Sequence, residues 1–174
     1  MMAFDVETYE KDFSIILEIG FVVSSLARPE KSKEAFHFII AENSHFVNSE
    51  YVPDNRDKCK FGTSERMSLK DAAAKFMQHM RDVDFLVTHS GAHDEAYLAS
   101  SGISLERKTM FDTQLLALAL LTSGTAVFGL KRLLNDLAIT FDEDILHNAG
   151  NDAYYTLKLF LALAKKISES VSFT

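Results

Sequence analysis

Five residues with chemically active side chains stand where this sequence changes from strand to loop or from loop to helix: Asp5, Glu7, Asp94, His147 and Asp152. Asp5 and Glu7 are two apart in FDVET, and alternate side chains of an extended strand share a face, so both carboxylates point the same way. Asp94 follows the apolar run FLVT, and Asp152 lies near the start of the last helical stretch. Because sites in α/β proteins gather where strands end and helices begin, the pattern predicts that these residues converge.

Such a convergence would bring four carboxylates into one place. At about 5 Å and an effective dielectric constant of about 20, each pair repels by roughly 3 kcal/mol. Divalent cations would remove that repulsion. Oxygen ligands favour Mg²⁺ or Mn²⁺, and the only cysteine of the chain, Cys59, lies outside these motifs.

Each of these residues has a plainer interpretation when it is taken alone. The segment DVE could be a solvated strand end, Asp94 a helix cap, and Asp152 an acidic residue favoured by the helix dipole. His147 alone could be a surface loop residue. Residues five apart lie about 140° apart around a helix, so His147 and Asp152 can act together only if His147 precedes the helix. We therefore expect His147 on a loop, with Asn148 or a neighbour capping the helix.

His89 and His93 are spaced i,i+4, as zinc ligands on a helix are. The segment HSGAH lacks the glutamate of the HExxH metalloprotease motif and contains a glycine, which disfavours a helical zinc site.

The elements that must position the acidic residues follow from the apolar runs. Five runs are predicted as strands, the first three joined by short connections into an antiparallel meander: residues 1–8, 13–26, 34–43, 84–90 and 108–113. Five helices are predicted, the first capped by Ser68 and the second ended by Gly102: residues 69–82, 93–102, 113–124, 129–138 and 152–170. The polar stretch 43–67 is predicted as a long loop. The fold class is α/β, with a mixed sheet of about five strands flanked by helices.

The composition suits one soluble domain, 1–174, with 47% hydrophobic and 25% charged residues. The first strand begins almost at the N-terminus, which fits a domain cut from a longer protein. No signal peptide and no apolar run of roughly 20 residues is found, so no membrane association is expected. The single cysteine favours a reducing, intracellular compartment, the cytoplasm or the nucleus. The net charge of −7 excludes long-range attraction of a polyanion by the whole surface, so a nucleic acid would be held locally.

Three segments in order, FDVET, LVTHSGAHDEAYL and HNAGNDAYYTLKLFLAL, resemble the three exonuclease motifs of the DEDDh superfamily, which has a ribonuclease H-like fold. IILEIGFVV, MFDTQLLAL and GLKRLLNDLAI resemble intervening segments of that superfamily, so the resemblance covers nearly the whole chain. HFIIAEN, YVPDNRDKCKFGTSE and HNAGNDAYYTL are similar to a little-characterised, mainly fungal branch of DEDDh domains.

The resemblance implies a role for each residue of the set. Asp5, Glu7, Asp94 and Asp152 would be ligands of two Mg²⁺ or Mn²⁺ ions, with Asp5 bridging both. Glu7 and Asp152 would complete the first ion's site, and Asp94 would hold the second. His147 would be the general base that deprotonates the attacking water, a task suited to a pKa of about 6.5.

The resemblance also points to substrate contacts and to two departures. Thr8 is expected to contact the 3′-terminal nucleotide through its backbone, and Tyr9 to offer a stacking surface. Ser90 and His93 stand where many relatives have Asn and Phe, which puts the substrate fit near Asp94 in doubt.

The expected function is therefore a metal-dependent 3′→5′ exonuclease that acts on the 3′ end of single-stranded nucleic acid. RNA is slightly favoured over DNA, short oligonucleotides suit the acidic balance, and nucleoside 5′-monophosphates would be the products. The basic residues available near the site are sparse: Lys11, Arg56, Lys58, Lys60 and Arg66. Two alternatives stay open, a catalytically silent scaffold or nucleic-acid binding module, and an unrelated phosphohydrolase of small nucleotides. A protein partner or a homodimer also stays open.

Overall fold

A computed structural model describes residues 1–29, 33–105, 108–121 and 128–171. Its sheet has six strands in the order β4-β3-β2-β1-β5-β6. The strands are β1 (Met2–Tyr9), β2 (Asp12–Ser24), β3 (Lys33–Ile40), β4 (Thr63–Met67), β5 (Phe85–Thr88) and β6 (Thr109–Asp112). The pairs β1–β2 and β2–β3 are antiparallel, and the pairs β1–β5, β5–β6 and β3–β4 are parallel. The predicted mixed sheet with an antiparallel start is confirmed.

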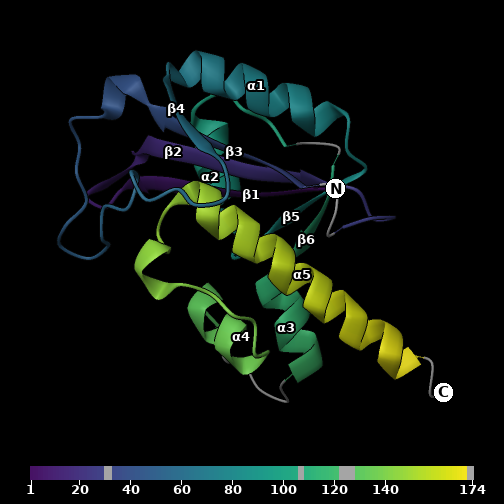
Figure 1. Ribbon diagram of the computed structural model, residues 1–174. Helices are drawn as coiled ribbons and strands as arrows, with labels where there is room; N and C mark the ends of the chain where they lie inside the picture. The colour runs from purple at the N-terminus through teal and green to yellow at the C-terminus, as the bar shows by residue number, and fades with distance from the viewer. Residues whose placement is uncertain (30–32, 106–107, 122–127, 172–174) are drawn as a thin grey trace.

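Helices cover both faces of this sheet (Figure 1). The α-helices are α1 (Leu69–Arg81), α2 (Ala92–Ser100), α3 (Thr113–Leu121), α4 (Leu130–Asp136) and α5 (Ala149–Val171), and two 3₁₀ turns are η1 (Ala41–Asn43) and η2 (Glu143–Ile145). Phe4 and Phe21 of the sheet pack against Phe76 of α1, and Leu98 of α2 joins the same core. The opposite face packs on α5, and α3 and α4 lie against the outer side of α5.

The predicted caps are confirmed. Ser68 Oγ accepts a hydrogen bond of 3.1 Å from the backbone N–H of Asp71 at the start of α1. Gly102, with φ +78°, follows the end of α2. The last three residues of the predicted helix 113–124 lie outside the described residues.

One strand was not predicted. Thr63–Met67 forms β4, which pairs in parallel with β3, although this segment was expected to belong to the long loop. Four of its five residues are exposed, so its sequence carries no apolar alternation. An edge strand of this kind is set by its neighbour's free hydrogen-bonding groups, which a local pattern does not reveal.

Candidate active site

Strand β1 presents two carboxylates on the face of the sheet that α5 covers. Asp5 pairs with Gly20 of β2, and Glu7 pairs with Glu18, so the two acidic side chains lie on the same face of β1, as predicted. The regular register of the β1–β2 pair ends directly after Glu7, where a bulge begins. Bulges redirect side chains at strand ends, and this one places the carboxylates beside the first turn of α5.

Asp94 reaches the same edge of the sheet from α2. Because β1 and β5 run parallel, their carboxyl ends lie together, and α2 begins shortly after β5 ends. Asp94 is buried in the first turn of α2, where its Oδ2 accepts a hydrogen bond of 3.1 Å from the Thr88 hydroxyl. Burial raises the pKa of Asp94 well above its ordinary value, and the charge of Asp5 adds to the shift, so the two carboxylates are close enough to interact.

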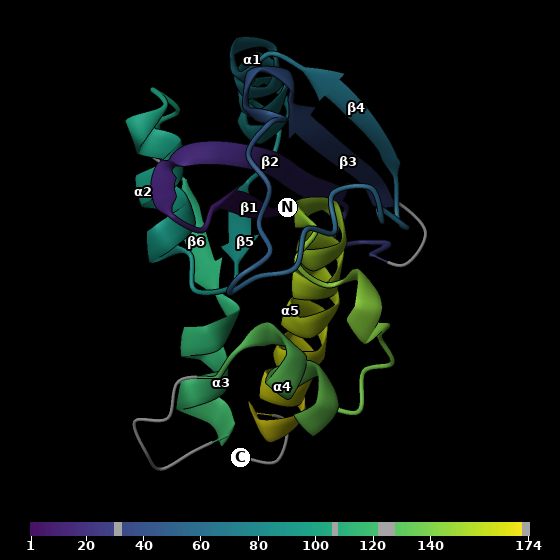
Figure 2. The same ribbon diagram turned by 90° about the vertical axis from the view of Figure 1, so that its left-hand side faces the viewer.

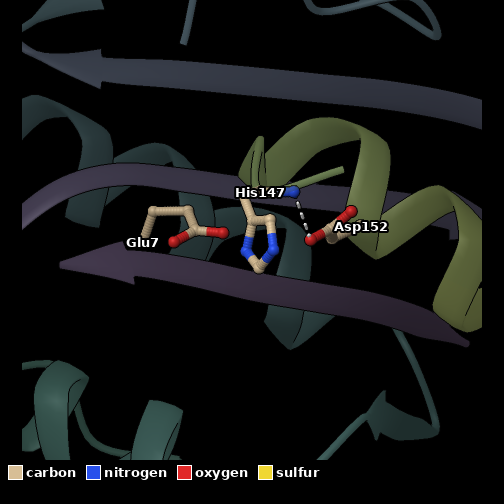
Figure 3. A group of neighbouring side chains, drawn as sticks. All are labelled: Glu7, His147 and Asp152. Carbon is tan, nitrogen blue, oxygen red and sulfur yellow. Dashed lines mark hydrogen bonds between the residues drawn. The ribbon is translucent and has the colours of Figure 1, made fainter. Parts of the chain in front are cut away.

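His147 and Asp152 come from the loop before α5 and from its first turn. Asn148 caps the helix, since its Oδ1 accepts a hydrogen bond of 3.1 Å from the Asn151 N–H. His147 therefore lies outside the helix, as expected, with φ +59°, and its own N–H donates to Asp152 Oδ2 at 3.0 Å. The imidazole is exposed and lies between the carboxylates of Glu7 and Asp152 (Figure 3). Ligand atoms of these three residues lie within 4.8 Å of one another.

The four carboxylates perturb one another's ionisation. Burial, followed by the charge of Glu18, raises the pKa of Asp5 to about 7. Burial raises the pKa of Glu7 well above its ordinary value, and the charges of Asp5 and Asp152 add to it. Burial and then Asp5 raise the pKa of Asp152 in the same way. Shifts in this direction mean that the folded chain resists holding all of these groups ionised at once.

The donor set fits small divalent cations. Asp152 Oδ1 is buried and, among the described residues, has no hydrogen-bond partner, whereas its Oδ2 is held by the His147 N–H. An ionised oxygen in that position is stabilised by a cation. Carboxylate oxygens with at most one imidazole nitrogen are ligands that Mg²⁺ and Mn²⁺ accept.

Comparison with known families identifies the family of this chain. Residues 1–163 match the family described as DNA polymerase III subunit epsilon-like, C-terminal domain (DEDDh_C). The chain belongs to this DEDDh family. The DEDDh chain is 28% identical over 199 residues to an uncharacterized protein of Saccharomyces cerevisiae, covering 92% of this chain and 40% of that protein. It is 28% identical over 179 residues to an uncharacterized nucleolar protein of Schizosaccharomyces pombe, covering 97% of this chain and 70% of that protein. The chain thus spans less than half of the first of these relatives.

Two solved structures with the same fold are a nuclease or contain a nuclease domain. The catalytic unit of Pan2 from Neurospora crassa, with protease and nuclease domains, superposes with a TM-score of 0.65 at 15% identity, over 97% of this chain and 27% of that one. Exonuclease X, solved with 5′ overhanging duplex DNA, gives a TM-score of 0.58 at 14% identity, over 94% of this chain and 90% of that one. These likenesses confirm the ribonuclease H-like fold.

The DEDDh chain contains a buried pair beneath the site that was not singled out from the sequence. Glu18 is 3% exposed, and its Oε2 accepts hydrogen bonds from His37 Nε2 at 2.7 Å and from the Ala149 N–H at 3.2 Å. Burial works to lower the pKa of His37, but hydrogen bonds to Cys59 and Glu18 outweigh it and raise that pKa to about 9. A charged residue inside the apolar run IILEIGFVV was the signal that could have revealed this pair.

The start of α5 packs against β2 without intervening side chains. A Cβ at Gly20 would lie 2.0 Å from the backbone carbon of Ala149, so only glycine fits there. This close approach holds the first turn of α5 directly against the sheet. It therefore sets the distance between Asp152 on α5 and Asp5 on β1. Glu18 then fixes the direction of the helix start through the Ala149 N–H.

The long loop between η1 and β4 joins the two halves of the site. Asn48 Nδ2 donates to the Thr8 carbonyl at 2.9 Å, next to Glu7. Asn55 Nδ2 donates to the Leu146 carbonyl at 2.6 Å, next to His147. The loop is thus an organised wall of the site, which its polar composition alone did not indicate.

The four residues expected to contact the substrate have different surroundings in the structure. The Thr8 carbonyl is already bonded to Asn48, and Tyr9 packs against Phe46 with ring centroids 5.0 Å apart. Ser90 has φ +62°, and its N–H donates to Asp112 Oδ1 at 3.2 Å, so that loop is pinned by a carboxylate from β6. His93 is exposed on α2 beside Asp94.

His89 and His93 do not meet as zinc ligands would. His89 Nδ1 shares a hydrogen bond of 2.9 Å with the Thr113 hydroxyl, and His89 is half-buried. His93 stacks toward Tyr97 instead.

A cavity of about 490 Å³ opens beside His147 and Asp152. The long loop and α4 supply its other walls, among them Pro53, Lys58 and Leu130. A larger cavity, of about 600 Å³, lies at the opposite end of β1 against Met1 and contains none of the acidic motif residues. The smaller cavity is therefore the candidate substrate site, because His147 and Asp152 line it. No helix in the described part of the chain is long and apolar enough to span a membrane.

Proposed function

We propose that this chain is a metal-dependent 3′→5′ exonuclease that releases nucleoside 5′-monophosphates from single-stranded nucleic acid. The observation that carries the proposal is the meeting of Glu7, His147 and Asp152, whose ligand atoms lie within 4.8 Å of one another, while the charges of Asp5 and Asp94 add to the raised pKa of Glu7. A silent scaffold has no need for a buried carboxylate cluster that costs folding free energy.

The carboxylates and the histidine have different roles in the proposed reaction. Asp5, Glu7, Asp94 and Asp152 would hold two Mg²⁺ or Mn²⁺ ions, which polarise the scissile phosphodiester and stabilise the leaving 3′ oxygen. The His147 imidazole accepts a proton from the attacking water while an oxygen–phosphorus bond forms and the bond to the 3′ oxygen breaks. Desolvation lowers the pKa of His147, which keeps the imidazole neutral and able to accept that proton at neutral pH.

The substrate class is part of the proposal. Pan2 from Saccharomyces cerevisiae, which has the same fold with a TM-score of 0.65 at 12% identity, was solved with AAGGA RNA. Exonuclease X was solved with DNA that carries a 5′ overhang. We favour RNA slightly over DNA. The nucleolar relative in Schizosaccharomyces pombe supports a nuclear place of action.

A paired assay tests the proposal. The protein is incubated with 5′-labelled single-stranded RNA and DNA of one sequence, in Mg²⁺, in Mn²⁺ and in EDTA, beside an Asp94→Asn variant. A one-nucleotide ladder that needs metal and is lost in the variant supports the exonuclease. Intact substrate under every metal condition would overturn it, and binding without cleavage would favour the scaffold.

A further inference from the structure

Thr88, the last residue of β5, is fully buried next to one of the proposed metal ligands. Its hydroxyl donates a hydrogen bond of 3.1 Å to Asp94 Oδ2 in the first turn of α2. Asp152 is held in a similar way in the other half of the site, where the His147 N–H donates to its Oδ2 at 3.0 Å. Two carboxylates from distant segments are therefore each oriented by a donor that binds one oxygen.

Thr88 is itself fixed by contacts with three neighbouring segments. It pairs with Asp112 in the parallel register of β5 with β6, and the Thr113 hydroxyl donates to the Thr88 carbonyl at 2.9 Å. A Cβ at Gly91 would lie 2.1 Å from Cγ2 of Thr88, so the backbone that starts α2 lies directly against this side chain. Figure 2 shows α2 beside β5 and β6, and α3 continuing from β6. The Thr88 side chain therefore has little freedom to turn away from Asp94.

The loop between β5 and α2 is pinned from the same side. Asp112 Oδ2 accepts a hydrogen bond of 2.9 Å from the Gly91 N–H, and its Oδ1 accepts one of 3.2 Å from the Ser90 N–H. Asp112 Oδ1 also accepts a bond of 2.8 Å from the Gln114 N–H at the start of α3. One carboxylate thus ties the loop before α2 to the next helix, which keeps Asp94 at a constant distance from the Thr88 hydroxyl.

Packing alone does not explain the hydroxyl of Thr88. The other residues of β5, Phe85, Leu86 and Val87, are apolar, and valine has nearly the same shape as threonine. A buried hydroxyl costs free energy unless it is hydrogen-bonded, and the proton of this one is directed to Asp94. The residue that would fill the space more simply is absent, and the residue present supplies a donor to a metal-site carboxylate.

We propose that Thr88 is a positioning residue for the second metal ion, because it fixes the direction in which Asp94 presents its carboxylate. This inference rests on the proposed function, in which Asp94 holds that ion, and it adds to the site a residue that does not itself touch metal or substrate. Partners that orient a metal ligand commonly contribute about 10- to 100-fold in metal affinity or activity.

Three variants separate the hydroxyl from the packing. Thr88→Val keeps the shape and removes the donor, whereas Thr88→Ser keeps the donor and removes the methyl that contacts Gly91. Thr156→Val is the matched control, because Thr156 is equally buried and its hydroxyl has no hydrogen-bond partner among the described residues. Metal-free protein is titrated with Mn²⁺, and free Mn²⁺ is measured by electron paramagnetic resonance without any substrate. Nuclease rates are then measured against Mn²⁺ concentration, and thermal melting in EDTA checks that each variant is folded.

We expect Thr88→Val to weaken the binding of one Mn²⁺ ion by about 10- to 100-fold. The Mn²⁺ concentration for half-maximal rate should rise by a similar factor, with the KM for the oligonucleotide unchanged. Thr88→Ser should recover the affinity, and Thr156→Val should bind Mn²⁺ as the wild type does. A Thr88→Val protein with the Mn²⁺ isotherm of the wild type would overturn the inference. Weaker binding in Thr88→Ser than in Thr88→Val would overturn it too, and would assign Thr88 to packing. If Thr88→Val does not fold, Thr88→Ala is compared with Thr88→Ser, and equal isotherms overturn the inference.

The metal titration and the nuclease assay can fail independently. Cleavage by the wild type, with an unchanged Mn²⁺ isotherm in Thr88→Val, leaves the exonuclease standing and overturns the role of Thr88. Weakened Mn²⁺ binding in Thr88→Val, without cleavage by the wild type, supports the role of Thr88 and overturns the exonuclease. A wild-type protein that binds no Mn²⁺ would overturn both.

Discussion

The backbone N–H of His147 donates a hydrogen bond of 3.0 Å to Oδ2 of Asp152. This bond closes the loop before α5 over its first turn and holds one oxygen of the carboxylate. The other oxygen, Oδ1, is left buried with no hydrogen-bond partner among the described residues, and the imidazole is directed toward Glu7 (Figure 3). One contact therefore orients both a candidate metal ligand and a candidate general base.

Replacing the His147 imidazole while keeping the bond from its backbone N–H to Asp152 tests the role of general base alone. We expect His147→Asn to lower kcat by about 10²- to 10⁴-fold, since general-base catalysis contributes about that much. Asparagine tolerates the positive φ of this position, so the thermal midpoint should change little. Steady-state kinetics in Mn²⁺ gives the comparison, with His45→Asn as the control, because His45 is an exposed histidine of the long loop that is not part of the proposed catalytic group. Unchanged kcat in His147→Asn would remove His147 from the mechanism.

The Asp94→Asn substitution should stabilise the metal-free protein and at the same time abolish its activity. The variant keeps an acceptor for the Thr88 hydroxyl but removes a buried charge that the neighbouring carboxylates disfavour. At pH 8 in EDTA we expect the free energy of unfolding to rise by about 1–3 kcal/mol while activity in Mn²⁺ is lost. Denaturant unfolding and the nuclease assay are run together. Glu95→Gln removes an exposed charge from the same turn of α2 and should change neither. A destabilised Asp94→Asn protein would argue against carboxylate repulsion.

Divalent cations should stabilise the protein more at pH 8 than at pH 5. Burial and mutual repulsion raise the carboxyl pKa values, that of Asp5 to about 7, so the metal-free folded state holds protons that the unfolded chain has released above about pH 4. Stability of the metal-free protein therefore falls as the pH rises through 7. Cations at about 100 times their Kd add about 2.7 kcal/mol, or roughly 5–10 °C, where the carboxylates are ionised. Scanning calorimetry with Mn²⁺ and EDTA at both pH values measures the difference. An equal shift at pH 5 and pH 8 would contradict the repulsive cluster.

The pair of Glu18 and His37 should govern stability in a second pH range. Because hydrogen bonds with Cys59 and then Glu18 raise the folded pKa of His37 to about 9, the contribution of His37 is fully present below about pH 6.5 and is lost as the pH rises through 9. That difference corresponds to on the order of 3 kcal/mol. Glu18→Ala leaves a buried cation without its carboxylate and should cost about 3–5 kcal/mol.

Unfolding of Glu18→Ala is compared with that of Glu65→Gln, which breaks an exposed pair with Lys75 and should cost at most about 1 kcal/mol. The comparison is made in saturating Mn²⁺, so that the metal-site carboxylates do not contribute to the pH dependence. A Glu18→Ala protein as stable as the Glu65→Gln control would show that the buried pair is neutral overall.

Local patterns were enough to predict the parts of the site that depend on strand alternation and helix starts. The spacing of Asp5 and Glu7, the position of Asp94 after an apolar strand, and the place of His147 before a capped helix all follow from short-range rules. These are the features that neighbouring residues decide.

The parts that were missed depend on contacts between distant segments. Glu18 and His37 meet through the register of β2 with β3, and their partner Ala149 is 131 residues from Glu18. The bonds from Asn48 and Asn55 to Thr8 and Leu146 cross 40 and 91 residues. A polar loop sequence allows such bonds without indicating their partners, and β4 is set by pairing rather than by its own composition.

The most direct test of the central claim identifies the first product and the source of its new oxygen. A single-stranded RNA with a distinctive 3′-terminal base is incubated with the protein and Mn²⁺ in water enriched in oxygen-18, and the released nucleotide is analysed by mass spectrometry. We expect the 5′-monophosphate of that terminal nucleoside, with one oxygen-18 in its phosphate, and none of it from Asp94→Asn. Release of a 3′-phosphate, release from the 5′ end, or the same yield from Asp94→Asn would contradict a 3′→5′ exonuclease built on these carboxylates.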